Sequence, residues 1–158
     1  LIIHMAYEWA QRVGDMRTLQ WSNIDLDTKT LDLEQSKRRA EVRLPIDDNL
    51  CRMLAEQKDT FGFQLYVAPA VEPQGSAYKP YASGDIHKLV NEVKAHAGLP
   101  PEITAMDLRR TGITQLVEGG VDTFGIMQVS GHSNPQSVKP YLVNTLTGST
   151  NALANRKK

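Results

Sequence analysis

The sequence lacks several features that would identify common classes of protein. It has one cysteine, Cys51, among 158 residues, so it can form neither an internal disulfide nor a pair of thiolates for a structural zinc. No apolar run approaches the roughly 20 residues that span a bilayer. We therefore expect a chain without a membrane partner in a reducing compartment, with the cytoplasm as its location.

The sequence also lacks an excess of either charge. Its 18 Lys and Arg residues balance 18 Asp and Glu residues, so net charge gives no support for nucleic-acid binding, which usually comes with a basic excess. Positive charge is nevertheless clustered in residues 37–43, which carry four basic side chains and one acidic one, and in residues 156–158. From charge alone, each cluster is either a phosphate-binding surface or a solvated segment.

The length of the chain predicts one domain over residues 1–158, because 158 residues can bury a sizeable core. Apolar residues at steps of three and four predict a core helix over residues 1–21. Polar and apolar residues alternate over 30–34 and 41–45, which predicts an antiparallel hairpin with a basic tip and with Pro45 ending its second strand. Residues 60–82 contain Pro, Gly and Ser and are expected to form a long loop.

Side chains that can accept hydrogen bonds from the first turn of a helix precede four further helical patterns. The predicted helices run from Asp47 or Asp48 to about 58, from Ser83 to 97, from Thr104 with Asp107 to 118, and from Asp122 to 129. The tail has weak helix potential after Ser149. The predicted fold class is α+β, a mostly helical domain with a small antiparallel β-sheet.

Three groups of residues carry chemistry. The C-terminal third contains Asp107-Leu108-Arg109-Arg110-Thr111, then Gly131-His132, then Tyr141 nine residues later; Gln11-Arg12-Val13-Gly14-Asp15 lies near the start, and Gln35-Ser36-Lys37 precedes the hairpin tip. In this order they resemble the two arginine boxes, the hairpin lysine, the Gly-His pair and the tyrosine of the tyrosine recombinase (phage integrase) family. The resemblance spans nearly the whole chain and implies the C-terminal catalytic domain of that family.

The resemblance implies site-specific DNA recombination by strand cleavage and rejoining. Tyr141 would attack a phosphodiester and form a 3′-phosphotyrosyl link. Arg12 and Arg109 would bind the nonbridging oxygens, since guanidinium groups make bidentate, charge-assisted hydrogen bonds. Lys37 would protonate the leaving 5′ oxygen, and His132 would bind the phosphate or orient the site. This chemistry requires no cofactor and no metal.

Several of these roles have competing interpretations. Arg110 competes with Arg109, and its alternative is a structural or phosphate-positioning role. Lys37 could instead be a solvated lysine beside two further basic residues, and His132 a hydrogen-bonded core histidine. Asp15 lies three residues after an arginine and is interpreted as structural, through pairing with a nearby cation.

One position departs from the family pattern. The family usually has a histidine three residues before its second arginine, and here that position is Met106, whose thioether cannot transfer a proton. Three interpretations follow: a slower enzyme, an enzyme in which water or His132 substitutes, or a domain that retains binding alone.

Other functions are weighed against this one. A serine hydrolase requires a Gly-x-Ser-x-Gly elbow, which residues 130–133 do not form. A metal site requires clustered ligands, whereas the four histidines lie far apart in the sequence. A type IB topoisomerase-like enzyme that relaxes DNA, and a catalytically impaired DNA-binding or assembly module, remain alternatives.

The resemblance also implies partners. Double-stranded DNA is the expected substrate, and residues 142–158 are expected to act as a C-terminal arm that passes to a neighbouring protomer, giving a tetramer on paired sites. The family's N-terminal core-binding domain is expected to lie outside these 158 residues. A bacterial or phage-encoded protein is the expected source.

Overall fold

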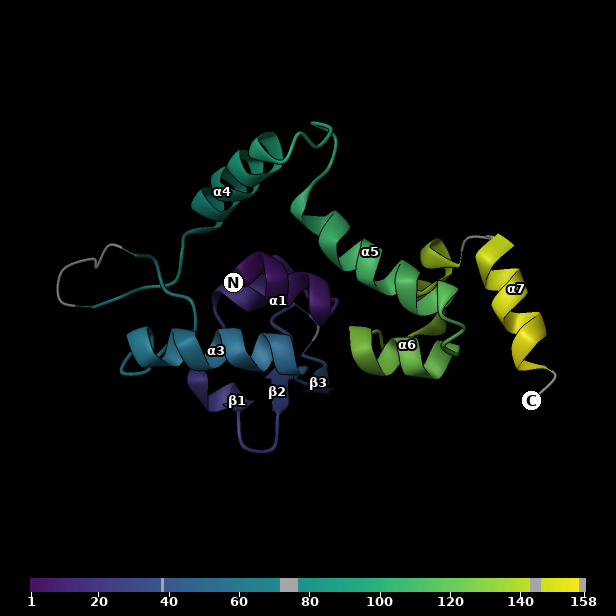
Figure 1. Ribbon diagram of the computed structural model, residues 1–158, viewed down its shortest axis with the longest axis horizontal. Coiled ribbons are helices and arrows are strands. Elements are labelled where there is room, and N and C mark those ends of the chain that lie inside the picture. Colours follow the sequence, from purple (N-terminus) through teal and green to yellow (C-terminus); the bar gives the residue numbers. More distant parts are fainter. Residues whose placement is uncertain (38, 72–76, 143–145, 157–158) are drawn as a thin grey trace.

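The computed structural model describes residues 1–37, 39–71, 77–142 and 146–156 (Figure 1). Within these residues the fold is mostly helical with one small antiparallel sheet, so the predicted fold class is confirmed. The elements are α1 (Ile2–Glu8), α2 (Val13–Arg17), η1 (Trp21–Asn23), β1 (Ile24–Asp25), β2 (Thr30–Glu34), β3 (Glu41–Pro45), α3 (Asp48–Phe61), α4 (Ser83–His96), α5 (Ala105–Glu118), α6 (Thr123–Ser130), η2 (Pro135–Ser137), η3 (Lys139–Tyr141) and α7 (Leu146–Asn155).

The sheet has the order β1-β2-β3, and the predicted hairpin is confirmed at both strands and at Pro45. Leu31 pairs with Leu44 and Leu33 with Val42, and all four side chains are buried, whereas the alternate positions of both strands are largely exposed. This is the one-sided alternation that a half-buried sheet produces. The sequence did not predict β1, because two residues carry no periodicity.

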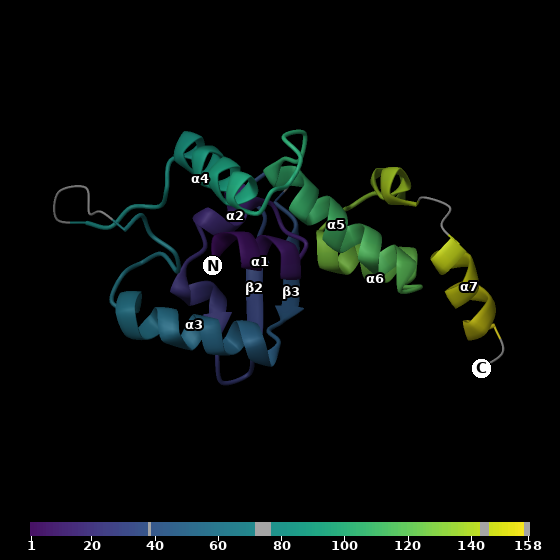
Figure 2. The ribbon, with the colours of Figure 1, turned by 45° about the horizontal axis from the view of Figure 1, so that its top comes forward.

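The main core lies between this sheet and the helices α1, α2 and α3 (Figure 2). Trp9 of the α1 end is 4% exposed, and its indole Nε1 donates to the Pro45 carbonyl at 3.0 Å, which ties the start of the chain to the hairpin. A second, smaller core joins Ala10, Ile113, Ile126 and Val138. This second core packs α5, α6 and the segment before Tyr141 against the end of α1.

The prediction of one helix over residues 1–21 was wrong. The chain forms α1 and α2, separated by a turn at residues 9–12 in which Ala10 has a φ of 49°. The apolar stripe continues through the turn, since Trp9, Val13 and Met16 are all buried, and periodicity therefore could not indicate the break. In this turn the Trp9 carbonyl accepts from the side chain of Gln11, within the turn itself, and the Ala10 carbonyl accepts from the distant Arg109.

Most of the predicted caps are confirmed. The side chains of Asp47 and Asp122 accept from Leu50 N and Gly125 N, both at 2.7 Å, and Thr104 with Asp107 forms a capping box. The cap of α4 is Ala82, one residue before the predicted Ser83, and α7 begins at residue 146, earlier than predicted. No helix in the described ranges is both long enough and apolar enough to cross a membrane.

Candidate active site

Arg109 is a buried cation at the centre of the candidate site. It lies on the inner face of α5 and is 2% exposed. Its Nη1 donates to the Ala10 carbonyl at 3.1 Å and its Nη2 to the Ser130 carbonyl at 2.6 Å. These two acceptors come from the α1–α2 turn and from the end of α6, so Arg109 joins three segments that are distant in the sequence.

Arg12 lies at the N-terminus of α2, beyond the same turn. Its Nη1 donates to Gln35 Oε1 at 3.1 Å and lies 3.7 Å from Asp15 Oδ2. Asp15 is 3% exposed, and its other oxygen accepts from the backbone N of Ser36 at 3.0 Å and from its hydroxyl at 2.5 Å. Asp15 therefore contacts both Arg12 and the start of the hairpin turn, which agrees with a structural role.

The electrostatics of this cluster favour an anion. The pKa of Arg109 is lowered to about 10, first by desolvation and next by the positive charge of Arg12, while Tyr141 and Asp15 raise it. Arg109 still carries its charge at neutral pH. Two guanidinium groups that repel each other in a partly desolvated site are stabilised by an anion that both can bind, and a phosphate oxygen fits this description.

Tyr141 is the last residue of η3 and is half-buried, packed against the second core. It lies close enough to Arg109 to raise the pKa of that guanidinium, against the larger effect of burial. The ring of His132 lies 5.9 Å from the Tyr141 ring, measured between centroids, at an interplanar angle of 44°. The structure thus brings together Arg12, Arg109, His132 and Tyr141, which lie up to 129 residues apart in the sequence.

The hydrogen bonds of His132 define its tautomer. Ser130 Oγ lies 2.6 Å from the Ile126 carbonyl, which can only accept, so the hydroxyl proton is used there. Ser130 Oγ also lies 2.7 Å from His132 Nδ1, which must therefore be the donor in that contact. This assignment makes Nε2 the basic nitrogen of the neutral ring. His132 is 8% exposed.

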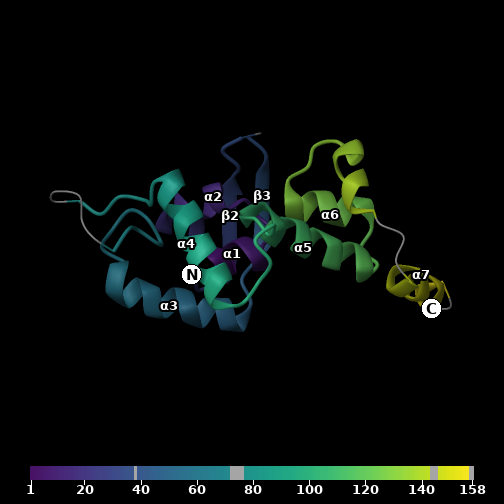
Figure 3. The same cartoon turned by 90° about the horizontal axis from the view of Figure 1, so that it is seen from above.

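Lys37 lies in the turn after β2, and its side chain is exposed. Of the two basic neighbours predicted to compete with it, Arg38 lies outside the described residues, and Arg39 pairs with Glu34 at 2.5 Å. Figure 3 shows the β2–β3 hairpin and the segment with η2 and η3 projecting toward the same side of the molecule. Lys37 is two residues after Gln35, which contacts Arg12, but the Lys37 side chain lies on a surface turn. Arg12 and Arg109 are called the arginine cluster below.

The two adjacent arginines of α5 have different surroundings. Arg110 is exposed, with 68% of its side chain accessible, and pairs with Asp107 on its own helix at 3.2 Å. Only Arg109 of this pair reaches the buried cluster. Met106 is 53% exposed at the start of α5.

Two buried glutamines were missed by the sequence reasoning. Gln11 and Gln35 are both fully buried, and Gln35 Nε2 donates to Gln11 Oε1 at 2.6 Å and to the Ser130 carbonyl at 2.9 Å. Gln11 Nε2 in turn donates to the carbonyls of Trp9 and Val129 at 2.8 and 2.7 Å. The available signal was position, because each glutamine is the first residue of a motif that the sequence analysis singled out, although no role was predicted for it.

Gly131 has a left-handed conformation, with φ of 68°, and ends α6. A Cβ at this position would lie 2.5 Å from Gln35 Nε2. We therefore expect Gly131→Ala to destabilise the fold by about 1–2 kcal/mol through backbone strain and by a further ~1–3 kcal/mol through the clash. Chemical denaturation would measure this loss.

Gly14→Ala is the matched control. Gly14 is in α2, where an added methyl group would have no neighbouring atom within 4 Å, and its backbone is helical. Alanine is favoured over glycine inside a helix by about 0.5–1 kcal/mol, so this variant should be slightly more stable. Equal stability of Gly131→Ala and the unaltered chain would contradict the assigned packing.

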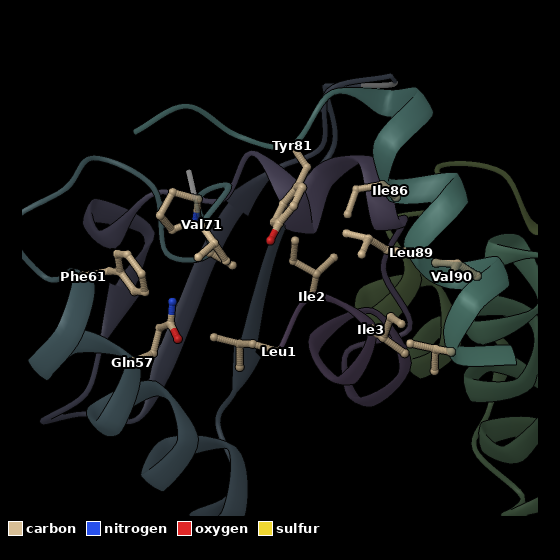
Figure 4. Close-up of a pocket in the computed structure, with 13 residues that line it drawn as sticks. Leu1, Ile2, Ile3, Gln57, Phe61, Val71, Tyr81, Ile86, Leu89 and Val90 are labelled. Atoms are coloured by element: carbon tan, nitrogen blue, oxygen red, sulfur yellow. The ribbon is translucent and has the colours of Figure 1, made fainter. Parts of the chain in front are cut away.

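An apolar groove lies elsewhere on the molecule. It has a volume of about 320 Å³ and is lined by side chains of α1, α3, α4 and the loop between the last two (Figure 4). Its lining includes Ile2, Phe61 and Ile86, with Gln57 and Tyr81 as polar members. It contains no arginine, lysine or histidine among the described residues, so it does not offer the cationic surroundings that a phosphodiester requires.

Comparisons with known proteins agree with the architecture. The model of the phage integrase family matches residues 1–146. Tyrosine recombinase XerA of Thermococcus kodakarensis is 26% identical over 145 residues, which are 89% of this chain and 49% of that protein. The chain therefore spans about half the length of this curated relative.

Solved structures have the same fold. A crystal structure of XerA recombinase aligns with a TM-score of 0.79 at 17% identity, covering 99% of this chain and 56% of that one. A lambda integrase dimer bound to a COC′ core site aligns with a TM-score of 0.70 at 22% identity, covering 90% and 41%. A lambda integrase tetramer bound to a Holliday junction aligns with a TM-score of 0.69 at 21% identity, covering 89% and 40%.

Proposed function

Because the chain belongs to the phage integrase family, we propose that it is the catalytic domain of a DNA-cleaving and DNA-joining tyrosine recombinase. The observation that carries this proposal is that η3, which ends at Tyr141, packs against α5, the helix of the buried Arg109, and that Arg12 lies close enough to lower the pKa of Arg109. A nucleophile beside two fixed cations suits attack on an anionic phosphodiester, since the cations stabilise charge that builds up in the transition state.

In the proposed cleavage step, the Tyr141 phenol gives its proton to water or to His132, and its oxygen attacks the scissile phosphorus. A bond forms between that oxygen and phosphorus, and the bond to the 5′ oxygen breaks. The DNA then carries a 3′-phosphotyrosyl link, and the leaving 5′ oxygen takes up a proton and becomes a hydroxyl. Rejoining reverses these steps with a 5′ hydroxyl as nucleophile, so the bond energy is conserved in the covalent link.

Each side chain of the cluster has a proposed role. Arg12 and Arg109 bind the nonbridging oxygens, and Lys37 supplies the proton to the leaving 5′ oxygen. His132 binds the phosphate or orients Tyr141, with its Nδ1 held by Ser130. Ionising a phenol with an ordinary pKa near 10 at neutral pH costs about 4 kcal/mol, and the two guanidinium groups reduce this cost by stabilising the phenolate.

Double-stranded DNA is the proposed partner, in the cytoplasm. We further propose that residues 142–158 act as an arm between protomers in a tetramer on paired sites, and that a separate DNA-binding domain completes the active protein. In support, α7 packs mainly against α5, where Asn151 Nδ2 donates to the Glu118 carbonyl at 2.5 Å, and the large side chains of Leu146 and Leu153 are exposed.

Covalent capture of DNA tests the proposed function. The probe is a pool of duplexes with a randomised core, each nicked a few nucleotides 3′ of the position to be cleaved. The short fragment that cleavage releases diffuses away with its 5′ hydroxyl, so the covalent intermediate cannot be rejoined and accumulates. A protein–DNA adduct on a denaturing gel, with its DNA recovered and sequenced, is the expected result. A folded chain that binds duplexes from the pool but yields no adduct would instead be a noncatalytic DNA-binding module.

Met106 gives a second test of the chemistry. We expect Met106→His to accelerate adduct formation by about ten- to a thousandfold, because a positioned proton-transfer group typically contributes 10²–10⁴-fold and the site partly compensates for its absence. Single-turnover cleavage of the captured nicked duplex would measure the rate. Met127→His, on α6, is the control for adding an imidazole outside this position. An unchanged rate for Met106→His would mean that proton transfer at this position does not limit cleavage.

A further inference from the structure

Gln35 occupies a place in the candidate site that the proposed roles do not use. It follows β2 directly, it is fully buried, and its side chain makes hydrogen bonds to three residues in two other segments of the chain. A buried amide without a structural or functional reason is unfavourable, because its desolvation must be offset by hydrogen bonds. Every polar atom of this side chain has such a partner.

The orientation of the amide is fixed by its surroundings. The guanidinium of Arg12 can only donate, so Gln35 Oε1 must face Arg12 Nη1, at 3.1 Å. The Ser130 carbonyl can only accept, so Nε2 must face it, at 2.9 Å. The second proton of Nε2 goes to Gln11 Oε1 at 2.6 Å. A donor and an acceptor are both required, and neither an apolar side chain nor a carboxylate supplies both.

The Ser130 carbonyl links Gln35 to the second arginine. It accepts from Gln35 Nε2 at 2.9 Å and from Arg109 Nη2 at 2.6 Å. Arg12 is therefore held, through one amide, to the same carbonyl that holds Arg109. This arrangement fixes the spacing of two cations that would otherwise repel each other.

The lack of charge on the Gln35 side chain matters as well. A carboxylate at position 35 would hold Arg12 more strongly, but it would neutralise the charge that a phosphate must meet. A neutral amide fixes the direction of the guanidinium and uses one of its five donors. The only carboxylate near Arg12 among the described residues, that of Asp15, lies 3.7 Å away and accepts from Ser36.

We propose that Gln35 is a positioning residue that holds the Arg12 guanidinium toward the scissile phosphate, at a fixed distance from Arg109, without cancelling its charge. This inference rests on the proposed function. Gln35 touches neither the phosphate nor the nucleophile and acts through Arg12. Gln35 also connects the arginine pair with the turn that contains Lys37. Its side chain accepts from Arg12, and its backbone N donates to Ala40 O across that turn at 2.8 Å.

The test is a double-mutant cycle on cleavage of the captured nicked duplex. Gln35→Met keeps the length of the side chain and removes its polar atoms, and we expect it to slow single-turnover cleavage at least about tenfold, because a displaced catalytic group can lose up to ~100-fold. Arg12→Lys removes the guanidinium group that Gln35 orients and keeps the positive charge. In the Arg12→Lys background, Gln35→Met should cause less than about a twofold further loss, because its effect passes through that guanidinium group.

The remaining outcomes are informative in the same experiment. Multiplicative losses in the double variant, or full activity of Gln35→Met, would overturn the positioning role while the unaltered chain still forms its adduct. Absence of an adduct from the unaltered chain would instead overturn the proposed function, and this inference with it. Gln57→Met is the matched control. Gln57 is on α3, and its Nε2 donates to the Val67 carbonyl at 3.0 Å, so this substitution should leave cleavage unchanged.

Gln35→Glu is the second variant, for use if the methionine variant does not fold. It keeps the shape of the side chain, loses both donated hydrogen bonds and adds a negative charge beside Arg12. We expect a loss of at least about tenfold here as well, again nearly absent in the Arg12→Lys background. Thermal unfolding of each variant shows which of the two folds, and the cleavage rate of that variant is then used in the cycle.

Discussion

With phenylalanine in place of Tyr141, the chain is expected to form no covalent adduct with DNA. The substitution removes one oxygen atom, which is the atom that forms the bond to phosphorus in the proposed mechanism. The ring remains packed against the second core, so stability should change little. Denaturing electrophoresis of the captured nicked duplex would show complete loss of the adduct, while noncovalent binding in a native gel is retained.

Tyr7→Phe is the matched control for this result. The Tyr7 hydroxyl donates to Gln115 Oε1 at 3.1 Å on an exposed surface between α1 and α5, away from the arginine cluster. Removing this oxygen should cost less than about 1 kcal/mol in stability and leave adduct formation unchanged. An adduct that survives in Tyr141→Phe would identify another nucleophile and contradict the proposed mechanism.

Arg109→Ala is expected to have the second-largest effect. Loss of one preorganised donor to the transition state typically costs about 3–4 kcal/mol, which corresponds to a roughly hundred- to thousandfold slower cleavage. Arg109 also satisfies the Ala10 carbonyl, so the variant should lose about 1–3 kcal/mol of folding stability for this buried acceptor, whereas the Ser130 carbonyl still accepts from Gln35 Nε2. Single-turnover cleavage and denaturant unfolding, measured on the same preparation, separate the two effects.

Arg110→Ala is the control one residue along the same helix. Its exposed guanidinium pairs with Asp107, and surface pairs of this kind contribute about 0–1 kcal/mol. Cleavage of bound DNA should therefore change less than about threefold. If Arg110→Ala instead silenced the reaction and Arg109→Ala did not, the second arginine of the motif would be the one that binds the phosphate. Arg109→Lys, which keeps a charge at the site, provides a second variant should alanine prevent folding.

The sequence predicted the fold where local rules decide the structure. The hairpin strands alternate in a period of two, and Asp47, Thr104 and Asp122 are side chains whose chemistry favours helix starts, so these elements were found at the correct positions. The break between α1 and α2 escaped prediction because it depends on hydrogen bonds from Gln11 and Arg109, one of which comes from 99 residues away in the sequence. Such tertiary contacts leave no local pattern.

The candidate site was predictable in its members and not in its connections. The motifs singled out Arg12, Arg109, His132 and Tyr141, and the resemblance favoured Arg109 over Arg110, but that Arg109 is buried and Arg110 exposed is seen only in the structure. The role of Gln35 could not be predicted, because glutamine is usually a surface residue and its partners come from two segments that are distant in the sequence. That these residues perform catalysis stays a prediction for the experiments above.

The shallow docking of α7 has a thermodynamic consequence. Because this helix is attached chiefly at the end of α5, its release would expose little of either hydrophobic core. Its opening free energy should thus be well below that of global unfolding, and its amide hydrogens should exchange with deuterium long before those of α5. A segment that detaches so readily can be exchanged between molecules while the arginine cluster stays assembled in each of them.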